Sequence, residues 1–129
     1  MSRWIGVMSV VGIHLVLAVP GAVAQVACTA EFVPGVVVRI SDSKTGAPLA
    51  DSALAIVREK EYADTLDPFE YTSEGPLGSR QGAGERAGTY DVIVTRPGYA
   101  QWQTHGVRVA RDECHVKTVL LEARLKRLR

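Results

Sequence analysis

Several residue types are scarce in this chain of 129 residues, and each scarcity excludes a class of protein. Asparagine is absent, so the sequence contains no acceptor for Asn-linked glycosylation. The chain also has little excess of charge of either sign, because 15 Lys and Arg residues nearly balance 14 Asp and Glu residues. A chain with a net charge of only +1 has no strong long-range field to attract nucleic acid. We therefore expect no nucleic-acid partner.

Residues that hold metals or perform catalysis are few and scattered. The chain has two cysteines and three histidines, without a His-x-x-His or clustered Cys pattern. The loop carboxylates Asp64, Asp67, Glu70 and Glu74 do not follow the Asp-x-Asp-x-Asp-Gly spacing of a calcium loop. The sequence therefore predicts no metal, no cofactor and no catalytic residue set, so we expect a protein that is not an enzyme.

The longest apolar run lies at the start of the chain and is short. It extends from Trp4 to Val19 and is followed by the small residues Ala22-Val23-Ala24. A membrane-spanning helix needs roughly 20 apolar residues, whereas a signal peptide needs fewer and ends in an Ala-x-Ala site. We predict an N-terminal signal peptide helix over residues 1–24 and one mature domain over residues 25–129. The mature domain is expected to have no transmembrane segment.

Both cysteines, Cys28 and Cys114, lie in the expected mature part. An even number of cysteines in an exported protein predicts a disulfide bond. This bond closes a loop of about 87 residues, which in the chain-entropy account stabilises the fold by about 4.6 kcal/mol. The alternative is a lipoprotein anchored through Cys28, but Gln25 occupies a position where an aliphatic residue is usual. Acylation would also leave Cys114 as an odd thiol. We expect a secreted or periplasmic protein.

Alternating apolar residues and turn residues predict an all-β fold. No segment has a helical period with caps, and strands separated by Gly and Pro turns indicate an antiparallel β-sandwich. The strand expected over residues 53–60 is apolar on both faces, which predicts that other parts of the protein cover it on both sides. In the strand over residues 102–109, Gly106 is expected to form a bulge that resets the register. The expected strands begin at Val36 and include residues 53–60, 89–95, 102–109 and 114–125.

The stretch from Thr65 to Ala87 interrupts this pattern with many Gly and Pro residues. Structureless loops of this length are uncommon, so the stretch is expected to be functional or to conceal a short strand near Phe69 and Tyr71. Aromatic side chains beside turns can stack on a ligand. We therefore take Phe69, Tyr71 and Tyr99 as candidate ligand contacts.

Charged residues at two other places have simple expected roles. Glu85 and Arg86 are expected to form a surface ion pair, which is worth about 0–1 kcal/mol. The basic tail, with Arg124, Lys126, Arg127 and Arg129, is expected to be frayed and solvated.

The turn and strand residues together resemble a known family, the carboxypeptidase regulatory-like domain, which is a transthyretin-like (prealbumin-like) member of the Ig-like β-sandwiches. The resemblance implies an accessory module without catalytic residues, of a kind found in envelope, adhesive and carbohydrate-related proteins. It does not extend to the hydroxyisourate hydrolase of similar fold, since the chain ends Leu-Lys-Arg-Leu-Arg. The residues that carry the resemblance are Val36, Val38, Thr45-Gly46, Pro48-Leu49, Ala53, Gly88-Thr89-Tyr90, Val92, Val94, Gly98-Tyr99, Val107, Val109 and Leu125.

From the sequence we expect an exported, non-catalytic β-sandwich module that binds a protein or glycan in the cell envelope or extracellular space. One alternative is a small hydrolase that uses carboxylates of residues 64–74 with His105 or His115. A second alternative is a lipid-anchored structural protein of the envelope. Oligomeric state does not follow from the sequence.

Overall fold

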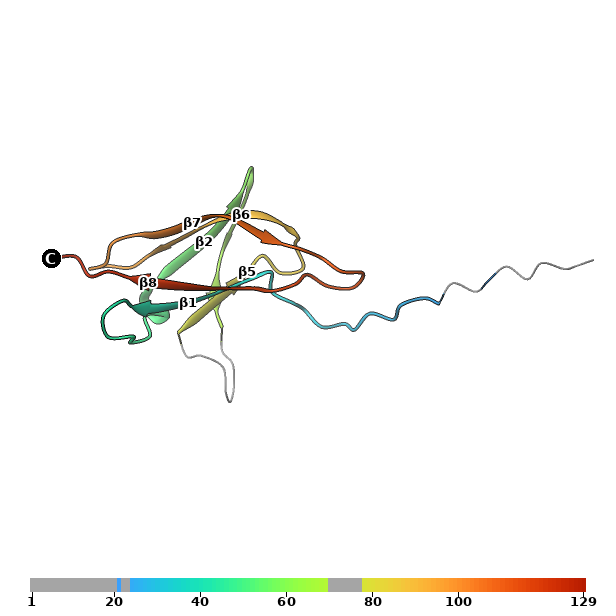
Figure 1. Cartoon of the computed structure of the whole chain (residues 1–129), viewed down its shortest axis with the longest axis horizontal. Coiled ribbons are helices and arrows are strands. Elements are labelled where there is room, and N and C mark those ends of the chain that lie inside the picture. Colours follow the sequence, from blue (N-terminus) through green and yellow to red (C-terminus); the bar gives the residue numbers. More distant parts are fainter. Residues whose placement is uncertain (1–20, 22–23, 70–77) are drawn as a thin grey trace, which may run out of the picture.

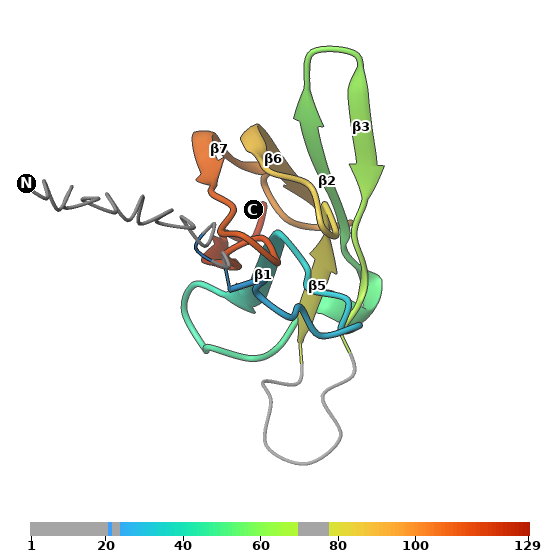
Figure 2. The same cartoon turned by 90° about the vertical axis from the view of Figure 1, so that its right-hand side faces the viewer.

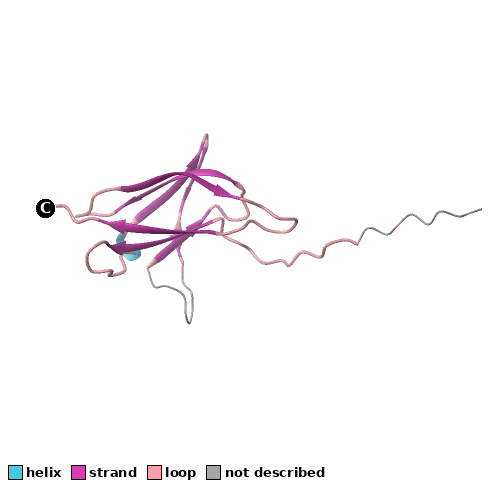
Figure 3. Ribbon diagram, viewed as in Figure 1, coloured by secondary structure: helices cyan, strands magenta, loops and turns pink. Residues whose placement is uncertain are grey.

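The computed structural model describes residue 21, residues 24–69 and residues 78–129. These residues form two β-sheets that pack as two layers, with a single 3-10 turn, η1 (Ala50–Ser52), beside them (Figure 1, Figure 3). The expected all-β sandwich is therefore confirmed. The expected signal peptide helix falls on residues that lie almost entirely outside the described ones, as does Tyr71.

Each sheet contains four strands. The first sheet has the order β4-β5-β1-β8, and the second has the order β3-β2-β6-β7. The strands of the first sheet are β1 (Val36–Asp42), β4 (Asp67–Pro68), β5 (Ser79–Gly82) and β8 (Val119–Leu125). Those of the second sheet are β2 (Leu54–Glu59), β3 (Tyr62–Thr65), β6 (Gly88–Thr95) and β7 (Trp102–Val109).

One pairing departs from the expected antiparallel arrangement. β1 and β8 run parallel, from Val36 beside Val119 to Asp42 beside Leu125. The other strand pairs are antiparallel. The alternation of apolar residues fixes which face of a strand is buried but not its direction, so the sequence pattern could not reveal this pairing. The consequence is that β1 and β8 finish at the same end of the sandwich.

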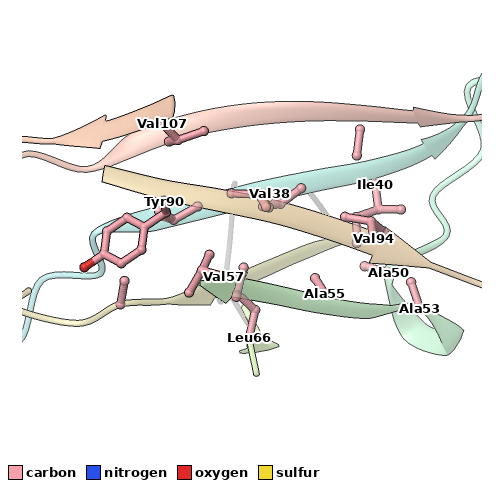
Figure 4. Close-up of a cluster of buried hydrophobic side chains, with 14 of the residues drawn as sticks. Val38, Ile40, Ala50, Ala53, Ala55, Val57, Leu66, Tyr90, Val94 and Val107 are labelled. Atoms are coloured by element: carbon pink, nitrogen blue, oxygen red, sulfur yellow. The ribbon is translucent and has the colours of Figure 1, made fainter. Parts of the chain in front are cut away.

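The core fills the space between the two sheets. Alternate residues of β1 and β6 point inward and are buried, as their spacing predicts. Leu66 and the ring of Tyr90 complete the packing, and Figure 4 shows them among the surrounding Val and Ala side chains. The Tyr90 hydroxyl donates to the Arg86 carbonyl oxygen at 2.9 Å, so the polar tip of this buried ring is satisfied.

The outer face of the second sheet is open, contrary to the expectation of cover on both sides. Ala55 and Val57 of β2 are fully buried, whereas Leu54 on the other face is 47% exposed. After β2 the chain turns at Lys60, which has φ of 52°, and returns as a separate strand β3. This hairpin projects beyond the rest of the sheet (Figure 2). Apolar residues on both faces of β2 therefore do not mean that both faces are covered.

The predicted bulge at Gly106 is confirmed. Tyr90 of β6 pairs with Val107, while Val92 pairs with Thr104, so β7 has one extra residue between these two pairs. Gly106 has φ of 68°, a left-handed conformation that glycine adopts without a steric penalty.

The Gly-rich and Pro-rich stretch does conceal strands, namely β4 and β5. β5 pairs antiparallel with β1, so this stretch supplies two strands of the first sheet. Its later glycine segment is tied to the fold, because Ala83 is fully buried and donates its N–H to Asp64 Oδ2 at 2.9 Å.

The disulfide bond between Cys28 and Cys114 is present, with an S–S distance of 2.03 Å. Cys114 does not lie in a strand, however, since β8 begins only at Val119. Asp112 explains the difference: its Oδ1 accepts the backbone N–H groups of Cys114 and His115, both at 2.9 Å, and folds this part into a turn. The bond fastens the N-terminal arm to the end of the sandwich opposite the C terminus (Figure 1).

Candidate functional site

Two clusters of polar side chains lie at opposite ends of the sandwich. The first, which we call the Tyr99 cluster, lies where β1 and β8 finish and consists of Asp42, Arg96, Tyr99 and Arg127. The second, which we call the Glu85 cluster, lies beside the disulfide and consists of Thr29, Glu85, Arg111 and His115.

Asp42 organises the loop that follows β1. Its side chain is only 2% exposed, and its Oδ1 accepts the backbone N–H groups of Lys44 at 2.8 Å and Thr45 at 3.0 Å. Asp side chains commonly stabilise turns in this way. Gly46 continues the turn with φ of 73°. The loop is thus held by the same carboxylate that forms the centre of the Tyr99 cluster.

The other carboxylate oxygen of Asp42 binds two side chains from distant parts of the chain. Asp42 Oδ2 accepts the Tyr99 hydroxyl at 2.9 Å and Arg127 Nε at 3.0 Å. The hydrogen bond from the Thr45 backbone, followed by that from Arg127, holds the pKa of Asp42 far below its ordinary value of 3.8. Asp42 is therefore an ionised carboxylate whose charge is matched by four donors.

Two guanidinium groups lie near the ring of Tyr99. The central carbons of Arg96 and Arg127 are each 5.5 Å from the ring centroid, which is within the range of cation–π attraction. Asp51 is the acidic neighbour of Arg96, at 3.8 Å from its Nη2. The cluster thus combines a half-buried aromatic ring with two cations.

The basic tail is docked, so the expectation that it is frayed was wrong. Ala100 donates its N–H to the Lys126 carbonyl oxygen at 2.8 Å, and Leu128 donates to the Gly98 carbonyl oxygen at 3.0 Å. Arg127 pairs with Tyr99 in an isolated β-bridge between these two bonds. The backbone of the tail is therefore fixed beside the turn that carries Tyr99.

The candidate ligand contacts are placed as follows. Tyr99 is half-buried in its cluster. Phe69 is also half-buried and follows β4, where its N–H donates to the Ser79 carbonyl oxygen at 3.0 Å. Ser79 in turn pairs with Arg39, in the middle of β1. Phe69 therefore lies at the β4 edge of the first sheet, level with the middle of β1, whereas Tyr99 lies beside the tail that follows β8.

The Glu85 cluster ties the N-terminal arm to the domain. Glu85 Oε1 accepts the Val33 N–H at 2.9 Å and lies 2.8 Å from His115 Nδ1, and these two contacts lower the pKa of Glu85. Arg111 lies 3.7 Å from Glu85 Oε2. The predicted ion pair of Glu85 with its neighbour Arg86 was therefore wrong. Both residues lie in the turn between β5 and β6, and their side chains reach different partners.

Arg86 instead joins the core-facing side of the β2–β3 hairpin. Its Nη2 lies 3.1 Å from Glu59 Oε2, and its guanidinium carbon lies 4.1 Å above the Tyr62 ring. This contact packs a charged group onto an aromatic face and has a structural role.

Of the loop carboxylates in the hydrolase alternative, Glu70 and Glu74 lie outside the described residues, and within the described part both histidines pair with other carboxylates. His105 pairs with Asp91 at 3.0 Å, and His115 pairs with Glu85. Asp64 is used by the backbone of Ala83. Instead, His115 Nε2 lies 3.1 Å from the Thr29 hydroxyl. Among the described residues, no group of three or more His, Cys, Asp or Glu is placed to hold a metal ion.

Sequence reasoning missed most members of both clusters. Asp42 had a usable signal, since an Asp followed by a Thr-Gly turn is typical of a side chain that caps its own loop. Arg127 and Thr29 had none, because their partners lie 85 and 86 residues away along the chain.

A scan of the chain against models of protein families finds no match, and a search of curated proteins finds no matching relative. In the described part of the chain, no helix is both long enough and apolar enough to cross a membrane. The disulfide indicates an oxidising compartment.

Proposed function

We propose that this chain is an exported, non-catalytic β-sandwich module that binds an envelope protein or a glycan at the end that carries the Tyr99 cluster. The observation that carries the proposal is the cluster itself: a half-buried aromatic ring, with two guanidinium groups near it, on a turn held by Asp42 and the docked tail. Aromatic and Arg side chains on rigid supports are the residues that most often dominate recognition surfaces.

The resemblance to the carboxypeptidase regulatory-like domain supports the same proposal. In that family the sandwich is an accessory to other domains. Two of the residues that carry the resemblance, Gly46 and Gly98, have φ of 73° and 81° here and shape the two turns beside the Tyr99 cluster. A module of this transthyretin-like kind would present these turns to its partner.

The test is a glycan and cell-wall array, with a pull-down, using the chain from Gln25 onward. Tyr99→Ala should weaken the binding found by at least tenfold, whereas Phe32→Ala should change it less than twofold. Phe32 is a matched control because it is 70% exposed and lies on the N-terminal arm at the opposite end. Melting temperatures check that each variant folds. The proposal fails if the protein retains no ligand, or if Phe32→Ala weakens binding as much as Tyr99→Ala.

A hydrolase is the second candidate because of one observation in the Glu85 cluster, which uses residues other than the carboxylates of residues 64–74 expected from the sequence. Thr29 Oγ1, His115 and Glu85 lie in series at 3.1 and 2.8 Å, the order of a hydroxyl nucleophile, a base and an orienting carboxylate. The nearby N–H groups of Cys114 and His115 already donate to Asp112, so they do not stabilise an oxyanion. Hydrolysis of an activated ester that disappears in both Thr29→Ala and His115→Gln would favour this candidate over a binding module.

The proposed compartment is the extracellular space or the periplasm, with a lipoprotein as the alternative. Cys28 uses its sulfur in the disulfide, and a sulfur in a disulfide cannot also carry the thioether-linked lipid. Mass spectrometry of the mature N terminus decides between the two: a peptide that begins at Gln25 excludes the lipoprotein, and a lipid-modified Cys28 excludes the disulfide in the mature protein.

A further inference from the structure

The Tyr99 cluster has more hydrogen-bond donors than its own acceptors use. Arg127 binds Asp42 through Nε alone, and within the described residues its two terminal nitrogens have no acceptor. Its side chain is 68% exposed. A guanidinium presents five N–H donors in a planar fork, so most of this donor set faces outward.

Arg96 is under-satisfied in a different way. Its side chain is 19% exposed, yet its Nη1 is buried without a hydrogen-bond partner in the described part of the chain. The nearest carboxylate, Asp51, lies 3.8 Å from Nη2, which is longer than a hydrogen bond, and its side chain is 79% exposed. A buried donor without an acceptor is costly, so a shift of the Arg96 side chain that brought Nη1 to a ligand acceptor would recover that cost.

The distance between the two guanidinium groups has an upper limit. Each lies 5.5 Å from the centroid of the Tyr99 ring, so their central carbons are no farther apart than twice that distance. Asp42 cannot neutralise a further cation, because its two oxygens already accept four donors. Lys126 and Arg129, which are exposed, add positive charge beside the cluster.

The structure argues against two other ways of binding a partner at this cluster, namely pairing with a peptide strand and insertion into a membrane. A peptide strand would need the backbone groups of residues 98–100, but the tail already occupies Gly98 and Ala100. Insertion into a membrane would require a tail free to bury Leu128, whereas the Leu128 N–H is bonded to Gly98. Binding by the guanidinium groups of Arg96 and Arg127 is compatible with the docked tail. Guanidinium groups bind carboxylate or sulfate groups, such as those on a polysaccharide.

We propose that the Tyr99 cluster binds the carboxylate or sulfate groups of an acidic polysaccharide through the guanidinium groups of Arg96 and Arg127. This inference rests on the proposed function and names the class of ligand for the same site. Bidentate contacts of Arg with such groups are charge-assisted, and binding through them weakens as salt rises.

The test measures binding of the chain from Gln25 onward to polygalacturonate, dextran sulfate and neutral dextran at 50 and 300 mM salt. The variants are Arg96→Gln and Arg127→Gln, with Arg108→Gln and Arg124→Gln as controls. Both controls remove an exposed Arg from a strand and keep the net charge equal to that of the test variants. Arg96→Gln leaves the hydrogen bonds of Asp42 intact, so it tests the site even if Arg127→Gln lowers the melting temperature.

The expected result is salt-sensitive binding to at least one acidic polymer and none to dextran, weakened at least tenfold in Arg96→Gln and less than threefold in the controls. Equal weakening in test and control variants would overturn the inference, since it would indicate non-specific charge attraction. Binding to neutral glycans that depends on Tyr99 but not on Arg96 would overturn it while leaving the proposed function intact. Absence of any ligand would overturn both. Arg96-dependent binding to vesicles of anionic lipid, without binding to the polymers, would assign the site to a membrane instead.

Discussion

Removal of the disulfide should destabilise the domain without unfolding it. The bond joins Cys28 and Cys114 across a sequence separation of 86 residues, which in the chain-entropy account is worth about 4.6 kcal/mol. The bond also holds the arm 29–32, whose residues are exposed in the fold. Release of the arm in the reduced native state offsets part of the loss, and we expect a net effect of about 2–4 kcal/mol, the usual range for a disulfide bond.

The assay is urea unfolding of the C28A/C114A variant beside the oxidised protein at neutral pH, with the melting temperature as a second readout. The expected loss corresponds to a fall in melting temperature of roughly 10–20 °C for a domain of this size. A chain that begins at Phe32 and carries Cys114→Ala provides the comparison for the arm. It should unfold within about 0.5 kcal/mol of C28A/C114A, since the core begins after the arm.

Two results would refute this reasoning. A loss below about 1 kcal/mol would mean that the unfolded chain gains little freedom when the bond is removed. A truncated chain that is much less stable than C28A/C114A would mean that the arm packs as part of the fold even without its covalent link.

Three further predictions concern the core, the backbone and pH. Leu66→Ala should cost about 3–4 kcal/mol by urea unfolding because Leu66 is fully buried, whereas Leu54→Ala, at a half-exposed position, should cost less than about 1 kcal/mol. Gly35→Ala should cost more than about 2 kcal/mol, since its Cβ would lie 2.5 Å from a backbone carbonyl oxygen; Gly106→Ala meets no atom within 4 Å and should cost about 1 kcal/mol through its φ of 68° alone. The lowered pKa of Asp42 means that its contribution to stability is complete above its ordinary value of 3.8 and is lost progressively as pH falls from that value through the lower folded value. Melting temperatures measured between pH 6 and pH 2 should therefore fall less steeply in Asp42→Asn than in the unaltered protein, and equal slopes would contradict the assignment.

The main outline of the fold could be predicted from local patterns. Alternation identified the buried faces of β1 and β6, because side chains of a strand point to opposite sides with a period of two. The change of phase in β7 identified the bulge at Gly106 for the same reason. The disulfide followed from the number of cysteines and an expected oxidising compartment.

The candidate site could be predicted only in part. Tyr99 was identified from its position beside a turn, but its partners Asp42 and Arg127 come from the first and last thirds of the chain. The last strand was placed too early, since the side chain of Asp112 turns the backbone at Cys114. The alternation of apolar residues does not reveal that the side chain of Asp112 accepts backbone N–H groups and forms a turn there.

The sequence by itself determined the buried faces, the covalent bond and the class of fold, because each depends on the order of neighbouring residues or on a count. Only the tertiary structure decided that β1 and β8 run parallel and finish together. That shared finish places the tail against the turn that carries Tyr99, so a buried carboxylate, an aromatic ring and two arginines meet at one end. Contacts between residues far apart in the chain depend on how strands are ordered in space, and hydrophobic alternation contains no information about that order.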